Sequence, residues 1–171
     1  MELVPKNTLA KRLGMTRKAV ETLIGTGVVR ETVTIGRNVY VPEEEAVRLE
    51  QVPFVEDPHE PALLVKVNAA QTDDETGRPW MGWKAGVDPA EQAQMDGVRQ
   101  YWQVRDPDRY VDNLLIPIAA GFVLSVYEVS TYSTLPGKVR SFEIKPAPKK
   151  RAKPFLNHRF PLRQGSFTDP R

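Results

Sequence analysis

The residues with the clearest chemical potential are a carboxylate and an amine two positions apart, Glu143 and Lys145. Residues i and i+2 of a strand share one face, and this carboxylate-x-lysine spacing is that of half a metal-dependent nuclease site. A further metal-binding carboxylate would be needed, and Asp112 is the upstream candidate. Because 22 acidic residues and ten lysines give about one such triplet by chance, a nuclease is the weakest of the alternatives.

The sequence offers few residues for other kinds of catalysis. There is no cysteine, which excludes disulfides and thiolate zinc sites, and the two histidines, His59 and His158, lie far apart in the sequence. No glycine-rich loop for a phosphate and no nucleophile–base pair is evident. We therefore expect a protein that is not an enzyme, with no catalytic residue, metal or cofactor.

Two segments, 78–84 and 99–103, combine aromatic rings with cations. Rings can stack on bases and cations can hold phosphates, so the segments could form a second site for nucleic acid or for a single base. The alternative is that the tryptophans pack a core. We favour that for Trp102, within an expected strand, and leave it open for the other two. The candidate residues are Arg78, Trp80, Trp83, Lys84, Arg99 and Tyr101.

Basic residues are concentrated towards the C-terminal end. Residues 138–171 hold ten basic and two acidic side chains, a net charge of +8, whereas the remainder carries −6. This asymmetry suggests a polyanionic partner. Prolines favour a flexible basic arm over residues 145–154, while the apolar residues within 155–167 favour packed, closing strands. The arm's candidate cations are Lys149, Lys150, Arg151 and Lys153.

The first fifty residues must position any groups that meet a partner, and they show a helix–turn–helix pattern. Asn7 or Thr8 can cap a first helix, and Thr16 can cap a second after a turn at Gly14. Apolar residues at helical spacing predict the buried face of the second helix: Val20, Leu23 and Ile24. The opposite face is polar: Arg17, Lys18, Glu21 and Thr22.

A hairpin and a third helix are expected next. Residues 32–35 and 39–41 alternate with period two around a turn at 36–38, the pattern of a short β-hairpin. Pro42 then opens a helix, and the three glutamates after it are favourable at the positive end of that helix.

A linker separates two expected domains. Residues 53–61 hold three prolines and three acids, and proline removes backbone donors and ends helices. We therefore expect one domain over residues 1–52, a linker over 53–61 and a β-rich domain over 62–171, which makes the fold class α+β. A polar connector is expected at 88–97, and the expected strands are 63–67, 99–104, 114–118, 122–129 and 139–144.

The order helix, turn, helix, hairpin, helix over residues 4–51 resembles the winged helix-turn-helix of excisionases and MerR-type regulators. The resemblance rests on Leu13-Gly14 at the turn, Thr16-Arg17, Gly27, the hairpin Ile35-Gly36-Arg37 and the helix from Pro42. The long dimerising helix of MerR regulators is missing, because Pro53 ends the third helix. The resemblance implies DNA contacts from the second helix and the hairpin. The candidate residues are Lys11, Thr16, Arg17, Lys18, Glu21, Thr22, Arg30, Arg37 and Asn38.

The segments RQYWQV, AGFVLSVYEV, KVRSFEIKPAP and FPLRQGSFTDP together resemble a PUA-like barrel. Domains of that superfamily, such as EVE, ASCH and SRA domains, are implied to bind RNA or modified bases in DNA. The resemblance spans about residues 62–171, and its motifs are loose.

These observations predict a non-enzymatic protein that binds double-stranded DNA, with a role in transcription regulation and a second domain that adds affinity or specificity. The alternatives are a reader of RNA or of modified DNA, and a winged domain that binds protein instead. No apolar run is long enough for a membrane span and no stretch resembles a signal peptide, so we expect a cytoplasmic, nucleoid-associated protein. The oligomeric state is left open.

Overall fold

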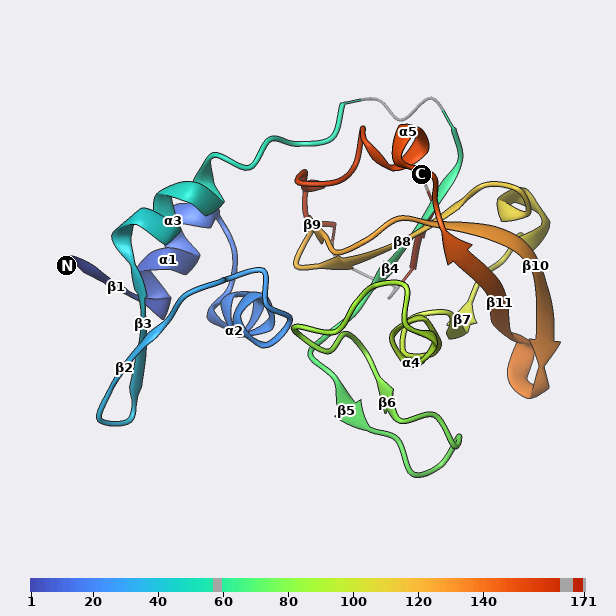
Figure 1. Ribbon diagram of the computed structural model, residues 1–171, viewed down its shortest axis with the longest axis horizontal. Coiled ribbons are helices and arrows are strands. Elements are labelled where there is room, and N and C mark those ends of the chain that lie inside the picture. Colours follow the sequence, from blue (N-terminus) through green and yellow to red (C-terminus); the bar gives the residue numbers. More distant parts are fainter. Residues whose placement is uncertain (57–59, 164–167, 171) are drawn as a thin grey trace.

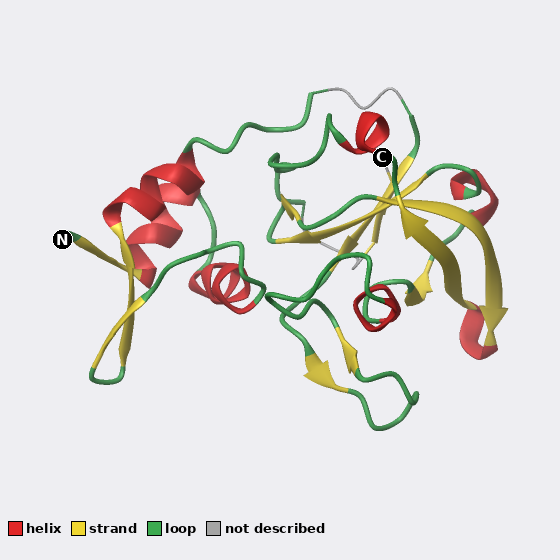
Figure 2. Cartoon of the chain, viewed as in Figure 1, coloured by secondary structure: helices red, strands yellow, loops and turns green. Residues whose placement is uncertain are grey.

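The computed structural model describes residues 1–56, 60–163 and 168–170, and its fold is α+β, as the sequence predicts. Helices gather in the N-terminal half and strands in the C-terminal half (Figure 2). Of the residues used in the sequence analysis, Asp57, Pro58, His59 and Phe167 lie outside the described residues.

Three helices and a small antiparallel sheet form the N-terminal half (Figure 1). The strand order is β1-β3-β2. The elements are β1 (Leu3–Pro5), α1 (Lys6–Leu13), α2 (Arg17–Gly25), β2 (Val33–Ile35), β3 (Asn38–Pro42) and α3 (Glu43–Glu50).

Local capping fixes the helix ends. The prediction for α1 is wrong by a few residues, because Pro5 with its fixed φ is the N-cap and the helix begins at Lys6. Gly14 ends α1 in the left-handed conformation at φ 66°. The prediction for α2 is confirmed, since the Thr16 hydroxyl accepts a hydrogen bond from the Ala19 amide at 3.1 Å. The expected hairpin is β2–β3, with Gly36 at φ 62° in its turn.

The C-terminal half is built on a seven-stranded sheet in which β4 and β8 run parallel and the other pairs antiparallel. The order is β12-β4-β8-β10-β11-β7, and β9 also pairs with β8. In this order β12 and β7 are the two edge strands, so the sheet is open. Its strands are β4 (Ala62–Lys66), β7 (Gln100–Gln103), β8 (Leu114–Ala119), β9 (Phe122–Val123), β10 (Tyr127–Leu135), β11 (Val139–Pro146) and β12 (Thr168–Pro170).

Smaller elements flank this sheet. A two-stranded ribbon projects from it (Figure 1). These elements are β5 (Gln71–Thr72), β6 (Trp80–Met81), α4 (Gln92–Asp96), α5 (Lys149–Ala152) and the 3-10 turns Pro107–Tyr110 and Pro136–Lys138.

Residues 122–129 form two strands and not the single strand expected. Ile118 pairs with Val123, and Leu115 pairs with Tyr127. Between these two pairs the chain from β9 to β10 is therefore one residue longer than β8. Pro117 lies between them on β8 and has no amide hydrogen to donate, which is where a ladder is readily interrupted.

Residues 145–154 are anchored and do not form the flexible arm considered from the sequence. Arg151 on α5 donates to Glu60 at 2.9 Å, to Glu128 at 3.1 Å and to the Asp112 carbonyl at 2.7 Å. The apolar residues that follow pack as expected, since Phe155 and Phe160 are buried. Residues 155–163 form a turn and isolated bridges instead of the closing strands expected there.

The two halves share a hydrophobic core. Ala119 and Phe122, at the turn between β8 and β9, pack in the same cluster as the buried residues of α1, α2 and α3. Beside this cluster, α2 approaches the second half closely, since a Cβ built at Gly25 would lie only 2.7 Å from the Ala69 Cβ. The described part of the expected linker is also fixed, because the Arg159 amide donates to the Pro53 carbonyl at 3.0 Å. The second half therefore constrains how α2 can meet a partner.

Candidate nucleic-acid interface

The first turns of α2 present a cationic, solvent-exposed surface. Val20 and Leu23 are fully buried and fix the rotation of the helix about its axis. This rotation leaves Arg17, Lys18 and Glu21 exposed, and the Arg17 side chain is 59% accessible.

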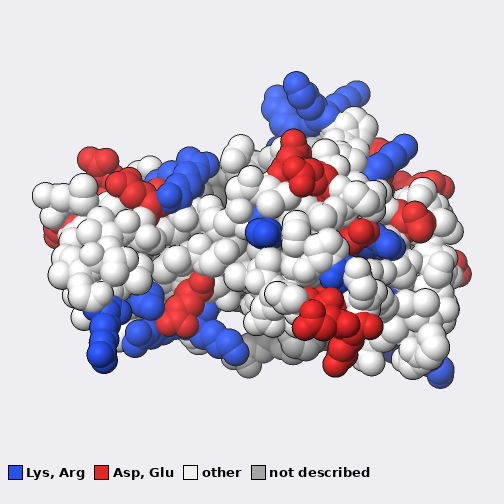
Figure 3. All heavy atoms as spheres, turned by 60° about the horizontal axis from the view of Figure 1, so that its bottom comes forward, with Lys and Arg blue, Asp and Glu red and all other residues white. Residues whose placement is uncertain are grey.

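Cations from three elements surround one hollow beside α2. This depression of about 250 Å³ is lined by Lys6 from α1, by Arg17 from α2, and by Arg37 and Asn38 from the β2–β3 hairpin. Figure 3 shows basic side chains gathered over the N-terminal half, on the left, with an acidic group between them. The structure thus brings Arg17 together with two predicted contact residues that lie about twenty positions later in the sequence, the neighbours Arg37 and Asn38.

Glu21 lies among these cations. Its carboxylate is 3.2 Å from Lys6 Nζ and 3.5 Å from Arg17 Nε. Glu21 therefore pairs with Lys6 and Arg17, two cations that would otherwise be available to bind phosphates. With Lys18 and Arg37 included, the group keeps an excess of positive charge.

The far side of α2 packs against the second half. The Thr22 hydroxyl is hydrogen-bonded within the helix, to the Lys18 carbonyl, and lies 3.3 Å from Asn68 Oδ1. Thr22 and Gly25 therefore contact the second half, although Thr22 is only half-buried and Gly25 is exposed. The contact of Thr22 with DNA stays a prediction, and the hydrogen bond of its hydroxyl to the Lys18 carbonyl limits what that hydroxyl can offer.

Two other predicted residues lie apart from the hollow. Lys11 is exposed on α1, and Arg30 lines a different cleft, between the two halves of the molecule. The Arg30 amide donates to the buried Glu45 at 2.8 Å. Burial alone would raise the pKa of Glu45, but the hydrogen bonds from the Arg48 guanidinium and the Arg30 amide lower it.

A groove runs along the second-half side of α2. It has a volume of about 640 Å³, and its lining includes Thr16 and Lys18 from the start of α2 and Lys66 and Asn68 from the end of β4. Lys66 Nζ donates to the Arg163 carbonyl at 2.7 Å, which keeps this amine at the edge of the groove. Lys66, Asn68 and Lys6 are site residues that the sequence reasoning missed.

Most of the aromatic–cation group has structural roles. Trp83 is 6% exposed because its amide and carbonyl pair with Asn68 and Ala70, which carries the ring into the core. Arg78 is buried against Asp73 at 2.5 Å. Hydrogen bonds from Thr76 and then from Arg78 hold the pKa of Asp73 well below its usual range. Of the two alternatives left open for Trp83, the structure shows the packed one, and the Arg78 guanidinium is committed to Asp73.

Arg99 is also committed within the protein, to Asp96 at 2.7 Å and to the Ser141 hydroxyl at 2.8 Å. This contradicts its expected role in the second site. Trp80 is half-buried and lies under the Lys84 amine, 4.8 Å from ring centroid to nitrogen. These two residues stay at the surface of the molecule.

A pocket of about 330 Å³ lies between β4, β6 and β7. Tyr101, Trp102 and Met81 supply its apolar lining, and the Arg78 guanidinium stacks 5.0 Å above the Tyr101 ring. The pocket and the groove beside α2 have Lys66, Val67 and Asn68 in common, so they adjoin.

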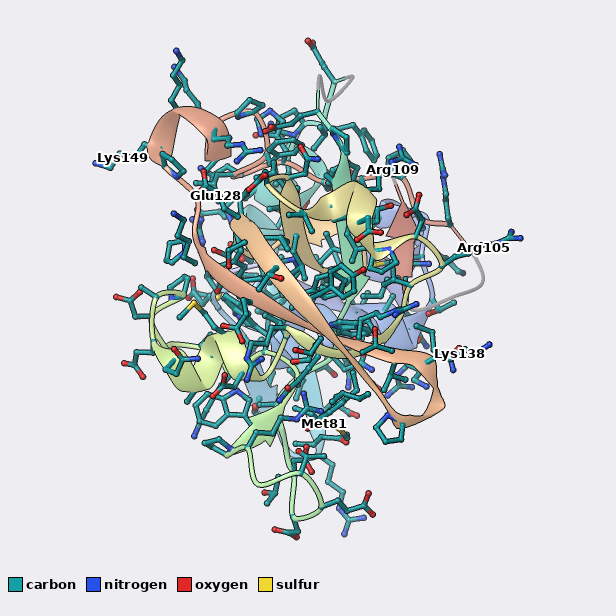
Figure 4. The ribbon with its side chains drawn as sticks, turned by 90° about the vertical axis from the view of Figure 1, so that its right-hand side faces the viewer. Met81, Arg105, Arg109, Glu128, Lys138 and Lys149 are labelled. Atoms are coloured by element: carbon teal, nitrogen blue, oxygen red, sulfur yellow. The ribbon has the colours of Figure 1, made fainter. Side chains whose placement is uncertain are left out.

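The basic segment forms a separate surface on α5. Lys149, Lys150 and Lys153 are exposed, and Figure 4 shows Lys149 pointing away from the body of the molecule. In Figure 1, α5 lies at the top of the molecule and the β2–β3 turn at its lower left. Arg151 faces inwards and holds the segment in place, so its predicted contact with nucleic acid is wrong.

The nuclease residues are not assembled into a metal site. Lys145 Nζ lies 3.6 Å from Glu128, on the neighbouring strand β10, while Glu143 is exposed on β11. Asp112 lies in a turn, where its amide donates a hydrogen bond to the Val129 carbonyl and its carbonyl accepts one from Arg151. Within residues 1–56, 60–163 and 168–170, no three His, Cys, Asp or Glu side chains group to hold a metal.

Comparisons with protein families, curated proteins and solved structures find nothing that matches this chain. Among the described residues, no helix combines the length and apolar character that a membrane span requires.

Proposed function

We propose that this protein binds double-stranded DNA through a winged helix-turn-helix made by α1, α2 and the β2–β3 hairpin. The observation that carries the proposal is the single cationic hollow lined by Lys6, Arg17, Arg37 and Asn38, from three elements. In this arrangement α2 is the recognition helix and the hairpin is the wing that touches the backbone or the minor groove.

The dimensions support this arrangement. An α-helix with its side chains is about 10–12 Å across, and the major groove of B-DNA is about 12 Å wide. Recognition helices contact base edges with their N-terminal residues. In α2 these are Thr16, Arg17, Lys18 and Glu21, all of which are exposed.

The second half limits the approach of a duplex. Because Thr22 and Gly25 face Asn68 and Ala69, only the first turns of α2 can enter a groove. A duplex seated there would pass the groove that contains Lys66. The second half thus adds a backbone contact, which is how it would raise affinity.

A salt series of duplex binding tests the proposal. Arg17→Ala and Lys18→Ala should each weaken binding by about 1–3 kcal/mol. Arg37→Ala should reduce the slope of log K against log salt by about 0.9, the loss of one phosphate contact. Arg105→Ala is the matched control, because this exposed cation lies in the second half, at its outer edge in Figure 4. Equal affinity for all four variants and the parent chain would exclude the proposed interface.

A second candidate function is the reading of a modified base or of RNA. The pocket under Tyr101 and Trp102 favours it, because 330 Å³ is large enough for a base and the pocket adjoins the groove beside α2. Tyr101→Ala should then lower affinity for modified duplex or RNA while leaving plain duplex unaffected. If modified duplex, plain duplex and RNA bind equally tightly, this function is excluded.

A further inference from the structure

A cleft between the two halves of the molecule has no part in the proposed DNA contact. Its volume is about 570 Å³, within the range of small-molecule sites. The chain segments that follow α2 and α3 form one wall, and β9, Trp83 and residues 157–158 form the other. In Figure 1 these elements meet in the middle of the molecule, beneath the segment that leads out of α3.

Trp83 is one of the residues that line this cleft. Trp83 is 6% exposed, and none of the described residues accepts a hydrogen bond from its indole N–H. The other two tryptophans are satisfied, since Trp80 donates to Gln94 at 3.3 Å and Trp102 to the Val98 carbonyl at 2.7 Å. A buried donor without an acceptor costs free energy. A ligand oxygen that accepts a hydrogen bond from the Trp83 indole N–H would remove that cost and so bind more tightly.

The charge on the lining is positive. Within the described residues, Arg30 has no carboxylate within ion-pair distance of its guanidinium. Arg48 is held by Glu45 at 2.5 Å and by the Val28 carbonyl at 2.7 Å. The buried Glu45 is hydrogen-bonded to Arg48 and to the Arg30 amide and attracts the Arg30 charge without a direct ion pair, so the Arg30 guanidinium can still pair with another anion.

The rest of the lining is mixed. Phe122 and Leu124 supply apolar surface, and Gln51 and His158 supply polar groups. His158 Nδ1 lies 2.7 Å from the Leu156 carbonyl. Because a carbonyl only accepts, Nδ1 carries the proton in this bond, and Nε2 is left to interact elsewhere.

We propose that the cleft is a binding site for a small organic anion. A carboxylate or phosphate group would pair with Arg30, an oxygen would accept the Trp83 indole N–H, and the carbon body would cover Phe122 and Leu124. The bound anion would bridge the two halves, because Arg30 belongs to the first half and Trp83, Phe122 and Leu124 belong to the second. It would therefore stabilise their packing.

Isothermal titration of the full chain with AMP and with citrate tests the site, and inorganic phosphate and adenosine serve as partial ligands. AMP or citrate should bind in a one-to-one ratio and raise the melting temperature with increasing concentration. Binding should weaken at least ten-fold in Arg30→Gln and in Trp83→Phe, which keeps the ring but removes the donor. Arg105→Gln and Trp80→Phe, which lie outside the cleft, are the controls.

The outcomes separate the components of the proposal. If neither AMP nor citrate binds, or if both bind Arg30→Gln as tightly as the parent chain, the proposed site is overturned. Adenosine binding as tightly as AMP would overturn the anion requirement, and inorganic phosphate binding as tightly would overturn the organic one. Arg30 is exposed, so Arg30→Gln remains a valid test if Trp83→Phe fails to fold. None of these measurements uses DNA, so the proposed function can fail independently.

Discussion

Glu21 offers the sharpest test of how the cationic surface works. Its carboxylate lies within 3.2 Å of Lys6 and 3.5 Å of Arg17, two of the cations assigned to the duplex. Before either cation can pair fully with a phosphate, its interaction with Glu21 must weaken. Glu21→Gln removes that competition and also removes a negative charge from the face that meets the DNA. We therefore expect Glu21→Gln to bind random-sequence duplex more tightly.

The magnitude follows from the exposure of the pairs. The side chains of Glu21 and Arg17 are 49% and 59% accessible, and that of Lys6 is 19% accessible. Exposed ion pairs are worth about 0.2–1 kcal/mol each. Loss of both pairs, together with less repulsion of the phosphates, should tighten binding by about three- to ten-fold. The gain should shrink as salt rises from about 50 to 200 mM, because screening weakens every interaction involved.

Fluorescence anisotropy with a labelled random duplex measures this effect across the salt range. Glu91→Gln is the matched control, since this exposed acid in the second half changes the net charge equally. Unchanged or weaker binding by Glu21→Gln would refute the competition argument. A loss confined to one DNA sequence would instead show that Glu21 accepts a hydrogen bond from a base, as the sequence first suggested.

Three further predictions concern stability. Thr16→Ala, which removes the cap of α2, should lower the free energy of unfolding by about 1 kcal/mol, whereas Thr16→Ser should restore most of it in urea denaturation. Gly25→Ala should destabilise by about 1–3 kcal/mol through its clash with Ala69, and a double-mutant cycle with Ala69→Gly should show relief; additive effects would contradict the contact. Glu45 has a lowered pKa in the folded state, so its contribution is present at about pH 7 and is lost as the pH falls through about 4 and below. Glu45→Gln should therefore be less stable than the parent chain near neutrality, and the difference should narrow in acid.

Local signals made the N-terminal half predictable. The capping hydroxyl of Thr16, the helical spacing of Val20 and Leu23, and the glycine of the β2–β3 turn each act over a few residues. Such signals fix helix and hairpin positions without knowledge of the remaining chain. The exposure of Arg17 and Lys18 followed directly from that periodicity.

Non-local pairing decided what the sequence could not. Trp80 and Trp83 are three positions apart, at the start of β6 and just after it, yet only Trp83 is carried into the core, by backbone pairing with Asn68 and Ala70. In the sequence Arg151 cannot be distinguished from its lysine neighbours. Its partners Glu60 and Glu128 are distant in the chain, and only the fold brings them to it. Composition describes a basic segment, but only the fold distinguishes a free cation from a paired one.

The same non-local contacts make the two halves one folding unit. Ala119 and Phe122 complete the core of the first half, so separating the halves would expose apolar surface on both sides. We therefore expect one cooperative transition in urea. Tryptophan fluorescence reports the second half, which holds all three tryptophans, and far-UV circular dichroism is weighted towards the first, which holds the three longest helices. The two probes should give the same midpoint, since coincident transitions mark two-state unfolding. An earlier loss of helical signal would show that α2 is held only loosely by the second half, and the restricted approach of the duplex to α2 would no longer follow.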